Sequence, residues 1–246
     1  MPSSFNAHFQ VRYDECAVDG TVRASALLRY VVETAFAHSA DKGFPLDWYD
    51  SHRLHWLVRR MRLELLQPVS YGAGLTVTTE VVGFRRIWAR RRNRIADQAG
   101  ARLGDATMDW IFTDGRGRPA RVPLEMETAF PGVSERMDLE HLEVGSQPSG
   151  LPADEYLIPA HQVDPLGHMN SAAYVDLFDD ALVALGVDVQ ARPAVYELEY
   201  FRAPRLGERL KRYVWEDRGG WSIQALDSLN ALAAIGRRWV PNSHDE

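Results

Sequence analysis

The sequence predicts an α+β protein built from two similar halves, each with one long helix and an antiparallel sheet. Apolar residues recur at helical spacing in two stretches, residues 28–35 and residues 174–185. Each stretch is followed by short runs in which apolar and polar residues alternate, as in half-buried strands. Between the halves, residues 131–154 are rich in proline, glycine, serine and acidic side chains, which indicates a linker.

The composition indicates a globular protein. The chain has 246 residues, of which 46% are hydrophobic and 25% charged, with a net charge of −6. No apolar run reaches the roughly 18 residues needed to span a bilayer, and the first residues lack the pattern of a signal peptide. We therefore expect a cytoplasmic protein with no membrane partner. A single cysteine, Cys16, excludes an internal disulfide, and its acidic neighbours indicate an unreactive thiol.

The first half, residues 1–130, is one predicted domain. It is expected to begin with a strand over residues 9–13 and an acidic turn over residues 14–21. A helix follows, with Ser25 as a plausible N-cap and Gly43 as its stop. After a loop over residues 44–53, strand-like runs cover residues 55–66, 75–83, 87–95 and 106–113.

The second half, residues 155–246, repeats this order and forms the second predicted domain. A strand over residues 156–163, a turn and a helix precede strands over residues 194–201, 209–216, 221–226 and 232–240. A shift of 135 residues superposes Leu75 on Leu210 and Gly72 on Gly207, and a shift of 146 superposes the helices. A long helix on a curved antiparallel sheet is the hotdog unit. We therefore predict a double hotdog, a pseudo-dimer within one chain.

The strongest chemical signal is the turn directly before the second helix, with the sequence Asp164-Pro165-Leu166-Gly167-His168-Met169-Asn170. Asn170 or Ser171 is the expected N-cap of that helix. The N–H groups and the positive dipole end of a helix start suit a carbonyl oxygen that develops negative charge. The same residue types are also ordinary turn and capping residues. The pattern therefore indicates either an acyl-transfer site or a well-capped loop.

Several segments of the chain match motifs of a known family. They are Val11-Arg12-Tyr13, residues 21–25, residues 32–35 with His38 and Gly43, His55-Trp56-Leu57-Val58-Arg59-Arg60-Met61, and Arg118-Pro119-Ala120-Arg121-Val122-Pro123. In order and spacing they resemble the acyl-acyl-carrier-protein thioesterases of bacteria and plastids. The resemblance covers nearly the whole chain. It implies a tandem hotdog hydrolase of fatty acid biosynthesis, with the catalytic residues in the second hotdog and a pocket for the acyl chain in the first.

The resemblance also assigns residues to the site. The family carries an Asp, an Asn two residues later and a His two further on, and a Glu-Cys pair on a following strand. Asp164 and His168 match the Asp and the His, whereas Leu166 replaces the Asn and Ala203-Pro204 replaces Glu-Cys. The segment from Asp164 to Gly167 is also similar to the Asp-Pro-x-Gly turn of 4-hydroxybenzoyl-CoA-type hotdog thioesterases, in which the Asp is the catalytic carboxylate.

The two halves differ at this turn. Aligned on the helices, Val18 stands opposite Asp164 and Val22 opposite His168, so the first copy lacks both the acid and the imidazole. We therefore expect one catalytic site per chain.

Thioester hydrolysis needs a base or nucleophile and donors for the oxyanion, but no metal or other cofactor. We expect Asp164 to be the general base for water, or a nucleophile that forms a mixed anhydride. His168 holds the water or protonates the departing thiolate. Gly167 permits close backbone approach, and its N–H or the next one polarises the carbonyl. Asn170 caps the helix and supports His168.

Four further acidic or imidazole side chains are weaker candidates for the site. Glu33 and His38 lie on the first predicted helix, and Glu197 and Glu199 lie on a later strand. The alternative roles are a solvated or capping position for the first pair and an exposed strand position for the second. Zinc binding through His161 and His168 is disfavoured because no third ligand has the spacing of a metal site.

Six arginines lie between residues 85 and 94. If this stretch is a strand, Arg86, Arg90, Arg92 and Arg94 share one face and form a basic stripe on an acidic protein. Acyl carrier protein is a small acidic domain, so the stripe is a candidate docking surface; the alternative is a solvated outer face. The net negative charge and the lack of a binding motif exclude nucleic acid as the expected partner.

The expected function is the release of free fatty acid from acyl-acyl-carrier protein (acyl-ACP) by thioester hydrolysis. Two alternatives stay open: an acyl-CoA thioesterase of the 4-hydroxybenzoyl-CoA type, and a non-catalytic double hotdog that binds acyl chains. A hotdog dehydratase is disfavoured, because the proline-rich motifs that carry its acid and histidine are not found. The chain is expected to be a monomeric pseudo-dimer or a homodimer.

Overall fold

The computed structural model describes residues 4–133 and 136–241. The chain divides into two compact units, Met1–Glu140 (unit 1) and His141–Glu246 (unit 2), and the boundary falls inside the predicted linker. No helix in the described ranges is both long enough and apolar enough to cross a membrane. Each unit is described by itself below.

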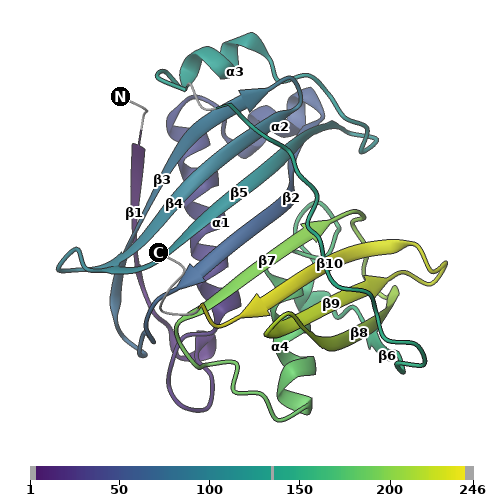
Figure 1. Ribbon diagram of the computed structural model, residues 1–246. Coiled ribbons are helices and arrows are strands. Elements are labelled where there is room, and N and C mark those ends of the chain that lie inside the picture. The colour runs from purple at the N-terminus through teal and green to yellow at the C-terminus, as the bar shows by residue number, and fades with distance from the viewer. Residues whose placement is uncertain (1–3, 134–135, 242–246) are drawn as a thin grey trace. The chain divides into compact units, whose positions relative to one another are not determined.

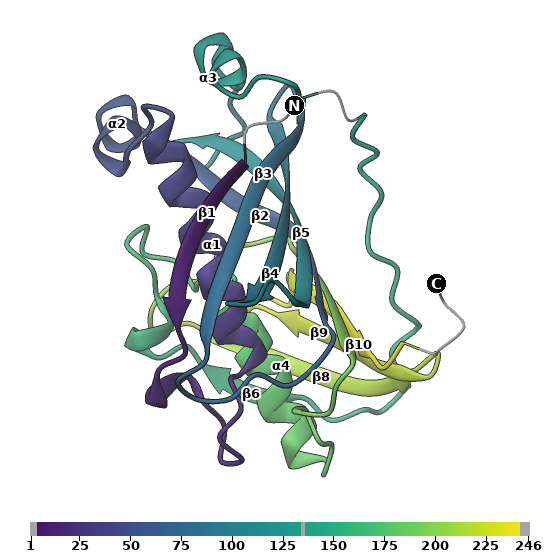
Figure 2. The same cartoon turned by 90° about the vertical axis from the view of Figure 1, so that its left-hand side faces the viewer.

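Unit 1 is one helix against an antiparallel sheet, with two short helices at one end (Figures 1 and 2). The sheet has the order β1-β3-β4-β5-β2, and α1 packs against β1 and β3. In chain order the elements are β1 (Ser4–Gln10), the 3-10 turn η1 (Tyr13–Glu15), α1 (Ala24–Asp41), α2 (Leu46–His52), β2 (Leu54–Leu65), β3 (Gly74–Arg85), β4 (Trp88–Asp97), β5 (Arg102–Asp114) and α3 (Leu124–Ala129).

The core of unit 1 follows from two periodicities. Leu28, Val31 and Ala35 lie on one face of α1 and are buried. Every second residue of β5 from Ala106 to Phe112 is buried on the inner face of the sheet. Burying one side chain of leucine size stabilises the folded state by roughly 1.5–3 kcal/mol. Burial of these side chains therefore determines which face of α1 lies against the sheet.

Unit 2 repeats the topology of unit 1. Its sheet has the order β6-β8-β9-β10-β7, the counterpart of β1-β3-β4-β5-β2. Its elements are β6 (Asp154–Leu157), the 3-10 turn η2 (Ala160–Gln162), α4 (Ala173–Ala184), β7 (Ala194–Tyr200), β8 (Arg209–Asp217), β9 (Gly220–Leu226) and β10 (Leu232–Trp239). Both sheets are antiparallel throughout. The predicted α+β double hotdog is confirmed.

Several predicted element boundaries are wrong. The first strand ends at Gln10 instead of spanning residues 9–13, because residues 13–15 turn into η1. The predicted strand over residues 156–163 ends at Leu157 and gives way to η2. The predicted loop over residues 44–53 contains α2, which begins after Pro45 and ends at His52; the C-cap residue Arg53 has the left-handed conformation. Helix α3, directly before the linker, was not predicted; both helices have too few residues to show a helical period.

Candidate active site

The turn that carries Asp164 and His168 lies between η2 and α4 of unit 2. The backbone N–H of Asp164 donates to the carbonyl oxygen of His168 at 2.9 Å, which closes the turn. The Oδ1 atom of Asp164 accepts the N–H of Leu166 at 3.0 Å and the N–H of His168 at 3.4 Å. The turn therefore brings the acid and the imidazole residue together in one closed loop.

The backbone of this turn favours glycine at position 167. The φ of Gly167 is +78°, which side chains with a Cβ rarely adopt, although no atom lies within 4 Å of an added Cβ. Its N–H donates to the carbonyl oxygen of Asp164 at 2.9 Å. The sequence predicts that this N–H or that of His168 polarises a thioester carbonyl, and the N–H of Gly167 is already used inside the turn.

Among the described residues, the same loop occurs three more times, at Asp97, Asp114 and Asp227. In each, the Oδ1 atom accepts the N–H groups two and four residues later, at 2.8 to 3.0 Å. The residue three positions later has a positive φ, as at Gly167. This recurrence supports the simpler interpretation that Asp164 is a turn aspartate.

Burial distinguishes Asp164 from a turn aspartate in solvent. Asp164 is half-buried, and this burial raises the pKa of its carboxyl above the ordinary value, although the N–H groups of His168 and Leu166 oppose the shift. At Asp114 the same backbone geometry goes with a lowered pKa, because the N–H and guanidinium groups of Arg118 dominate. A carboxylate with a raised pKa in a half-buried position is suited to accept a proton.

His168 is held by its backbone on both sides. It forms an antiparallel bridge with Arg205, and the next N–H, that of Met169, donates to the carbonyl oxygen of Pro204 at 2.7 Å. The Nδ1 atom of His168 is buried, and its imidazole acts on the carboxyl of Asp164 electrostatically, lowering that pKa. The two predicted catalytic side chains are therefore close enough to interact electrostatically.

Asn170 prepares the start of α4 but does not cap it in the predicted way. The helix begins at Ala173, and its N-cap is Ala172, which forms no side-chain cap bond. The Oδ1 atom of Asn170 accepts the N–H of Ala172 at 2.9 Å, and its carbonyl oxygen accepts the N–H of Ala173 at 2.9 Å. The predicted N-cap at Asn170 or Ser171 is wrong by one or two residues, because a local turn precedes the helix.

Unit 1 contains the counterpart of this turn. The N–H of Ala17 donates to the carbonyl oxygen of Thr21, and Gly20 has φ +80°. The bridge of Thr21 with Ser70 corresponds to the bridge of His168 with Arg205. These backbone bonds give a shift of 147 residues, not 146. Ala17 and Thr21, rather than Val18 and Val22, therefore stand in place of Asp164 and His168, and unit 1 lacks the acid and the imidazole.

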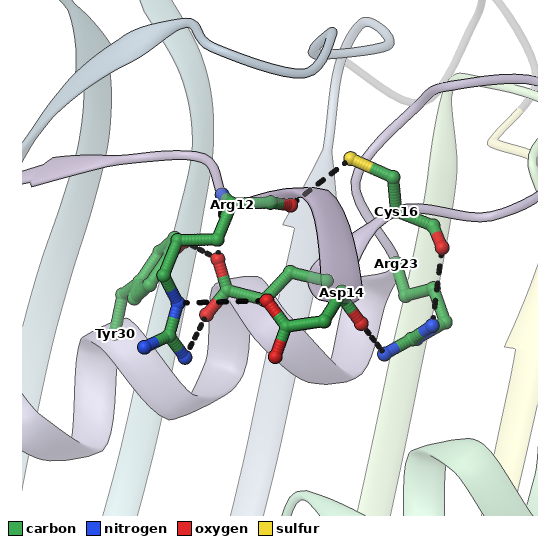
Figure 3. A network of polar contacts seen from close by, with 6 residues as sticks. Arg12, Asp14, Cys16, Arg23 and Tyr30 are labelled. Carbon is green, nitrogen blue, oxygen red and sulfur yellow. Dashed lines mark hydrogen bonds and ion pairs between the residues drawn. The ribbon is translucent and has the colours of Figure 1, made fainter.

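Polar contacts hold the counterpart turn in place (Figure 3). The guanidinium of Arg23 donates to the carbonyl oxygens of Cys16 at 3.1 Å and Asp14 at 2.7 Å. Glu15, which is buried, accepts from the backbone and side chain of Arg12 and from the hydroxyl of Tyr30. Burial is the main cause that raises the pKa of the Cys16 thiol, which agrees with a packing role for that cysteine.

The weaker candidates fall in different environments. Glu33 is exposed on α1, and Glu197 is half-buried on β7. Glu199 is a weaker site candidate whose alternative was an exposed strand position; that alternative is wrong, because its side chain is 3% exposed. Its two oxygens accept from the ring of His141 and from the N–H of Leu142, both at 2.8 Å. Glu199 therefore fastens the linker segment to the sheet of unit 2.

The arginine stripe is shorter than the sequence predicts. Arg86 lies in the turn before β4 with φ 56°, outside the strand. Arg90 forms a two-point ion pair with Asp109 at 2.6 and 2.9 Å. Arg92 and Arg94 are exposed on the outer face of β4, and Arg94 lies 3.9 Å from Asp105. Charge on the next strand thus offsets part of the stripe.

Sequence reasoning missed a crevice inside unit 1. It lies between α1, the sheet and α3, and encloses about 390 Å³ of space between atoms, its open mouth included. The crevice is narrow. Its walls are mainly aromatic and aliphatic, and include Trp56, Phe84, Trp110, Met126 and Phe130. One charged side chain lines it, that of Arg91.

Several solved structures have the same fold as this chain. The chain is similar to an acyl-ACP thioesterase from Bacteroides thetaiotaomicron, with a TM-score of 0.80 and 16% identity over 96% of this chain and 97% of that one. It is similar to a protein described as an oleoyl thioesterase from Lactobacillus plantarum, with a TM-score of 0.83 and 16% identity over 98% of each. A 12:0-ACP thioesterase from Umbellularia californica matches with a TM-score of 0.80 and 18% identity over 96% of each. At these identities the likeness establishes the double-hotdog fold.

The sequence defines the family. The model of the acyl-ACP thioesterase N-terminal domain matches residues 2–130, more than half of the 246 residues. The chain therefore belongs to the acyl-ACP thioesterase family and is a thioester hydrolase. No curated protein sequence matches this chain.

Proposed function

We propose that this chain releases fatty acids from acyl-ACP by hydrolysis at the Asp164 turn, with Asp164 as the group that activates water. The observation that carries the proposal is the half-burial that raises the pKa of Asp164, in a loop type that elsewhere in the chain has a lowered pKa at Asp114. A general base works best when its pKa moves toward the operating pH. Unit 1, with Ala17 in the same place, has no such group.

In the proposed reaction, water forms the new carbon–oxygen bond and Asp164 takes its proton. The carbon–sulfur bond of the tetrahedral intermediate then breaks, and His168 supplies a proton to the departing thiolate. In the other version, the carboxylate of Asp164 attacks the thioester and water hydrolyses the resulting anhydride. Both versions need Asp164 ionised, and neither step needs an oxidant or a reductant.

The oxyanion donor in this proposal is the N–H of His168. Its bond to the Oδ1 atom of Asp164 is long, 3.4 Å, whereas the N–H of Gly167 donates to a carbonyl oxygen at 2.9 Å. A long bond is weaker, so the N–H of His168 is the easier one to redirect to a developing oxyanion. Gly167 and Asn170 act by holding the turn and the helix start.

The division of labour between the units is part of the proposal. Residues 155–246 carry the chemistry, and residues 1–130, which lack the acid, supply the crevice for the acyl chain. The apolar lining of that crevice supports this role, because an aliphatic chain gains by leaving water. In this proposal, acyl carrier protein docks at the exposed Arg92 and Arg94. Arg86 lies in the turn before the same strand, and Arg90 contributes less because it is paired with Asp109. A cytoplasmic location stays a prediction from sequence.

Replacement of Asp164 tests the function. Asn keeps an oxygen for the N–H groups of Leu166 and His168 but does not take up a proton, so Asp164→Asn is expected to lower kcat on acyl-ACP by roughly 10²–10⁴-fold. Asp97→Asn is the matched control, because Asp97 accepts the same two backbone bonds in a hairpin of unit 1. Equal turnover by the Asp164→Asn variant and the parent protein contradicts the mechanism.

A second candidate is hydrolysis of acyl-CoA. The Asp-Pro-Leu-Gly run at residues 164–167 favours it, since this turn is similar to that of the 4-hydroxybenzoyl-CoA-type enzymes. Comparing kcat/KM for one acyl group on the two carriers separates the candidates. A clear preference for CoA assigns the second function, and no turnover on either carrier favours an acyl-binding protein.

A further inference from the structure

Arg91 is a buried cation near the crevice of unit 1. It lies on the inner face of β4, is 6% exposed and lines the crevice of unit 1. Its guanidinium donates to Nδ1 of His38 at 3.1 Å and to the hydroxyls of Ser39 at 3.0 Å and Thr79 at 3.5 Å. All three acceptors are uncharged side chains. Among the described residues, no carboxylate forms an ion pair with Arg91.

The surroundings do not neutralise this charge. Burial lowers the pKa of Arg91 to about 10, so the guanidinium is still protonated at pH 7. Burial, with the nearby charge of Arg91, lowers the pKa of His38 to about 4, so that ring is neutral. Burial raises the pKa of Tyr49, so the phenol is neutral as well. A buried charge is normally paired, so an uncompensated one beside a cavity indicates a missing anion.

A second buried donor belongs to the same crevice. The indole Nε1 of Trp110 is buried and has no hydrogen-bond partner within the described part of the chain. Trp110 lines the crevice, as does Phe130, whose ring centre lies 5.5 Å from the guanidinium carbon of Arg91. The crevice thus combines apolar walls with a buried charge that has no counter-ion and an indole N–H that has no acceptor among the described residues. A slender apolar ligand with an oxygen acceptor at one end matches both features.

We propose that the crevice of unit 1 binds an aliphatic chain that ends in a carboxylate, with Arg91 as its counter-ion. The guanidinium fork donates to the carboxylate oxygens, while the aromatic walls contact the chain. The carboxylate is either the far end of the acyl group of a substrate or the free acid itself. If the carboxylate belongs to the acyl group, the inference rests on the proposed thioesterase function. It then identifies the substrates as acyl groups that end in a carboxylate.

A purely structural role for Arg91 makes the opposite prediction about stability. If Arg91 only holds His38 and Ser39 in place, Arg91→Met lowers Tm. The ring nitrogen of His38 and the hydroxyl of Ser39 then lose their hydrogen-bond donor inside the core. If the site waits for an anion, removal of an uncompensated charge leaves Tm of the ligand-free protein unchanged or raises it. In that case dodecanoate raises the Tm of the parent protein but not that of Arg91→Met.

Binding to the full-length protein tests the proposal without catalysis. Isothermal titration calorimetry with dodecanoate and dodecan-1-ol compares two ligands that have the same aliphatic chain and differ in the charge of the head group. We expect dodecanoate to bind at least about tenfold more tightly, as a charged hydrogen-bonded pair implies, and Arg91→Met to lose this difference. Arg102→Met is the matched control, since Arg102 is an exposed arginine on β5 of the same sheet, and it keeps the difference.

Equal binding of the acid and the alcohol by the parent protein overturns the proposal, and this comparison needs no variant. Retention of the preference by a folded Arg91→Met variant overturns it as well. Hydrolysis kinetics separate the two sources of the carboxylate, the far end of a substrate's acyl group and the free acid. The KM for dodecanoyl-ACP is compared with the KM for the monothioester of dodecanedioate with ACP. A lower KM for the second, lost in Arg91→Met, assigns the substrate; binding of dodecanoate without that KM preference assigns the free acid. Failure of all hydrolysis contradicts the proposed function and leaves the titration as a separate test.

Discussion

Ala17 in unit 1 is the structural counterpart of Asp164 in unit 2. Both residues open a turn whose first N–H bonds the carbonyl oxygen four residues later, at 2.7 Å for Ala17 and 2.9 Å for Asp164. Both turns place a glycine with positive φ three residues on, Gly20 and Gly167. The turn therefore forms without a carboxylate, and the carboxylate of Asp164 is an addition to a backbone that already closes.

This relationship predicts the effect of Asp164→Ala on stability. Since the same backbone forms around Ala17, loss of the two bonds to Oδ1 is expected to cost about 1 kcal/mol in the free energy of unfolding. The activity is expected to be lost. Denaturant unfolding and turnover of acyl-ACP measure the two effects. A loss of stability several-fold larger, with activity falling only in proportion to the folded fraction, indicates a structural role for Asp164.

Gly167→Ala tests the backbone requirement. The added Cβ meets no atom within 4 Å, so the cost is the φ of +78° alone, roughly 1 kcal/mol. We expect a small loss of stability together with a clear loss of kcat, because the turn presents the active acid. Gly20→Ala, in the counterpart turn, is expected to cost the same stability and little kcat. Equal effects of both substitutions on kcat contradict the assignment of chemistry to unit 2.

The pH dependence of activity follows from the raised pKa of Asp164. Burial favours the neutral carboxyl, so the base form is lost at a higher pH than for a solvated aspartate, which has a pKa of about 3.9. Kinetics of kcat/KM against pH are expected to show an acid limb above that value. Circular dichroism at each pH separates this limb from unfolding. An acid limb at or below about 3.9, with the protein folded throughout, excludes Asp164 as the base.

The sequence predicts most of this fold because periodicity is strong in its long elements. The sequence predicts the positions of the long helices and of most strands. In unit 1, however, the predicted counterparts of Asp164 and His168 are wrong by one residue. The reason is local: α1 begins three residues after Thr21, whereas α4 begins five residues after His168. An alignment anchored on the helices cannot position a turn when the connection to the helix differs in length.

Arg91 shows why the crevice was missed. The alternation in β4 correctly places Arg90, Arg92 and Arg94 outward, which leaves Arg91 on the inner face. An arginine there is unexpected, since charged side chains are almost never fully buried without a partner. The sequence signal existed, because an inward charge in a strand is itself unusual. Its neutral partners, His38 and Ser39, come from a distant helix and are invisible in the local pattern.

Carrier docking predicts a salt-dependent effect. Arg92→Glu and Arg94→Glu are expected to raise KM for acyl-ACP several-fold, by repelling the acidic carrier, and to leave KM for acyl-CoA unchanged. The effect is expected to shrink as ionic strength rises. Arg116→Glu, at an exposed turn of unit 1, is the control. An equal rise of KM on both carriers, or no rise on either, argues for the solvated outer face.

Stability is expected to depend on pH through Asp179 in α4. This buried carboxyl accepts from the hydroxyl of Tyr196 at 3.0 Å, and burial raises its pKa to about 7. Between its unfolded pKa of about 3.9 and 7, the folded state keeps the proton that the unfolded state has released. The free energy of unfolding contributed by this group therefore falls by up to about 1.4 kcal/mol per pH unit as pH rises through that window, and is level above it.

Asp179→Asn isolates this contribution. The amide oxygen still accepts from Tyr196 but does not titrate, so subtraction of the variant from the parent protein removes the effect of other titrating groups. Urea unfolding of both proteins at several pH values between about 4.5 and 8 measures the difference. We expect the parent protein to lose stability relative to the variant up to about pH 7 and to run parallel to it above. Parallel curves over the whole range show that Asp179 is ionised in the folded protein, held so by the nearby Arg238 and Arg192.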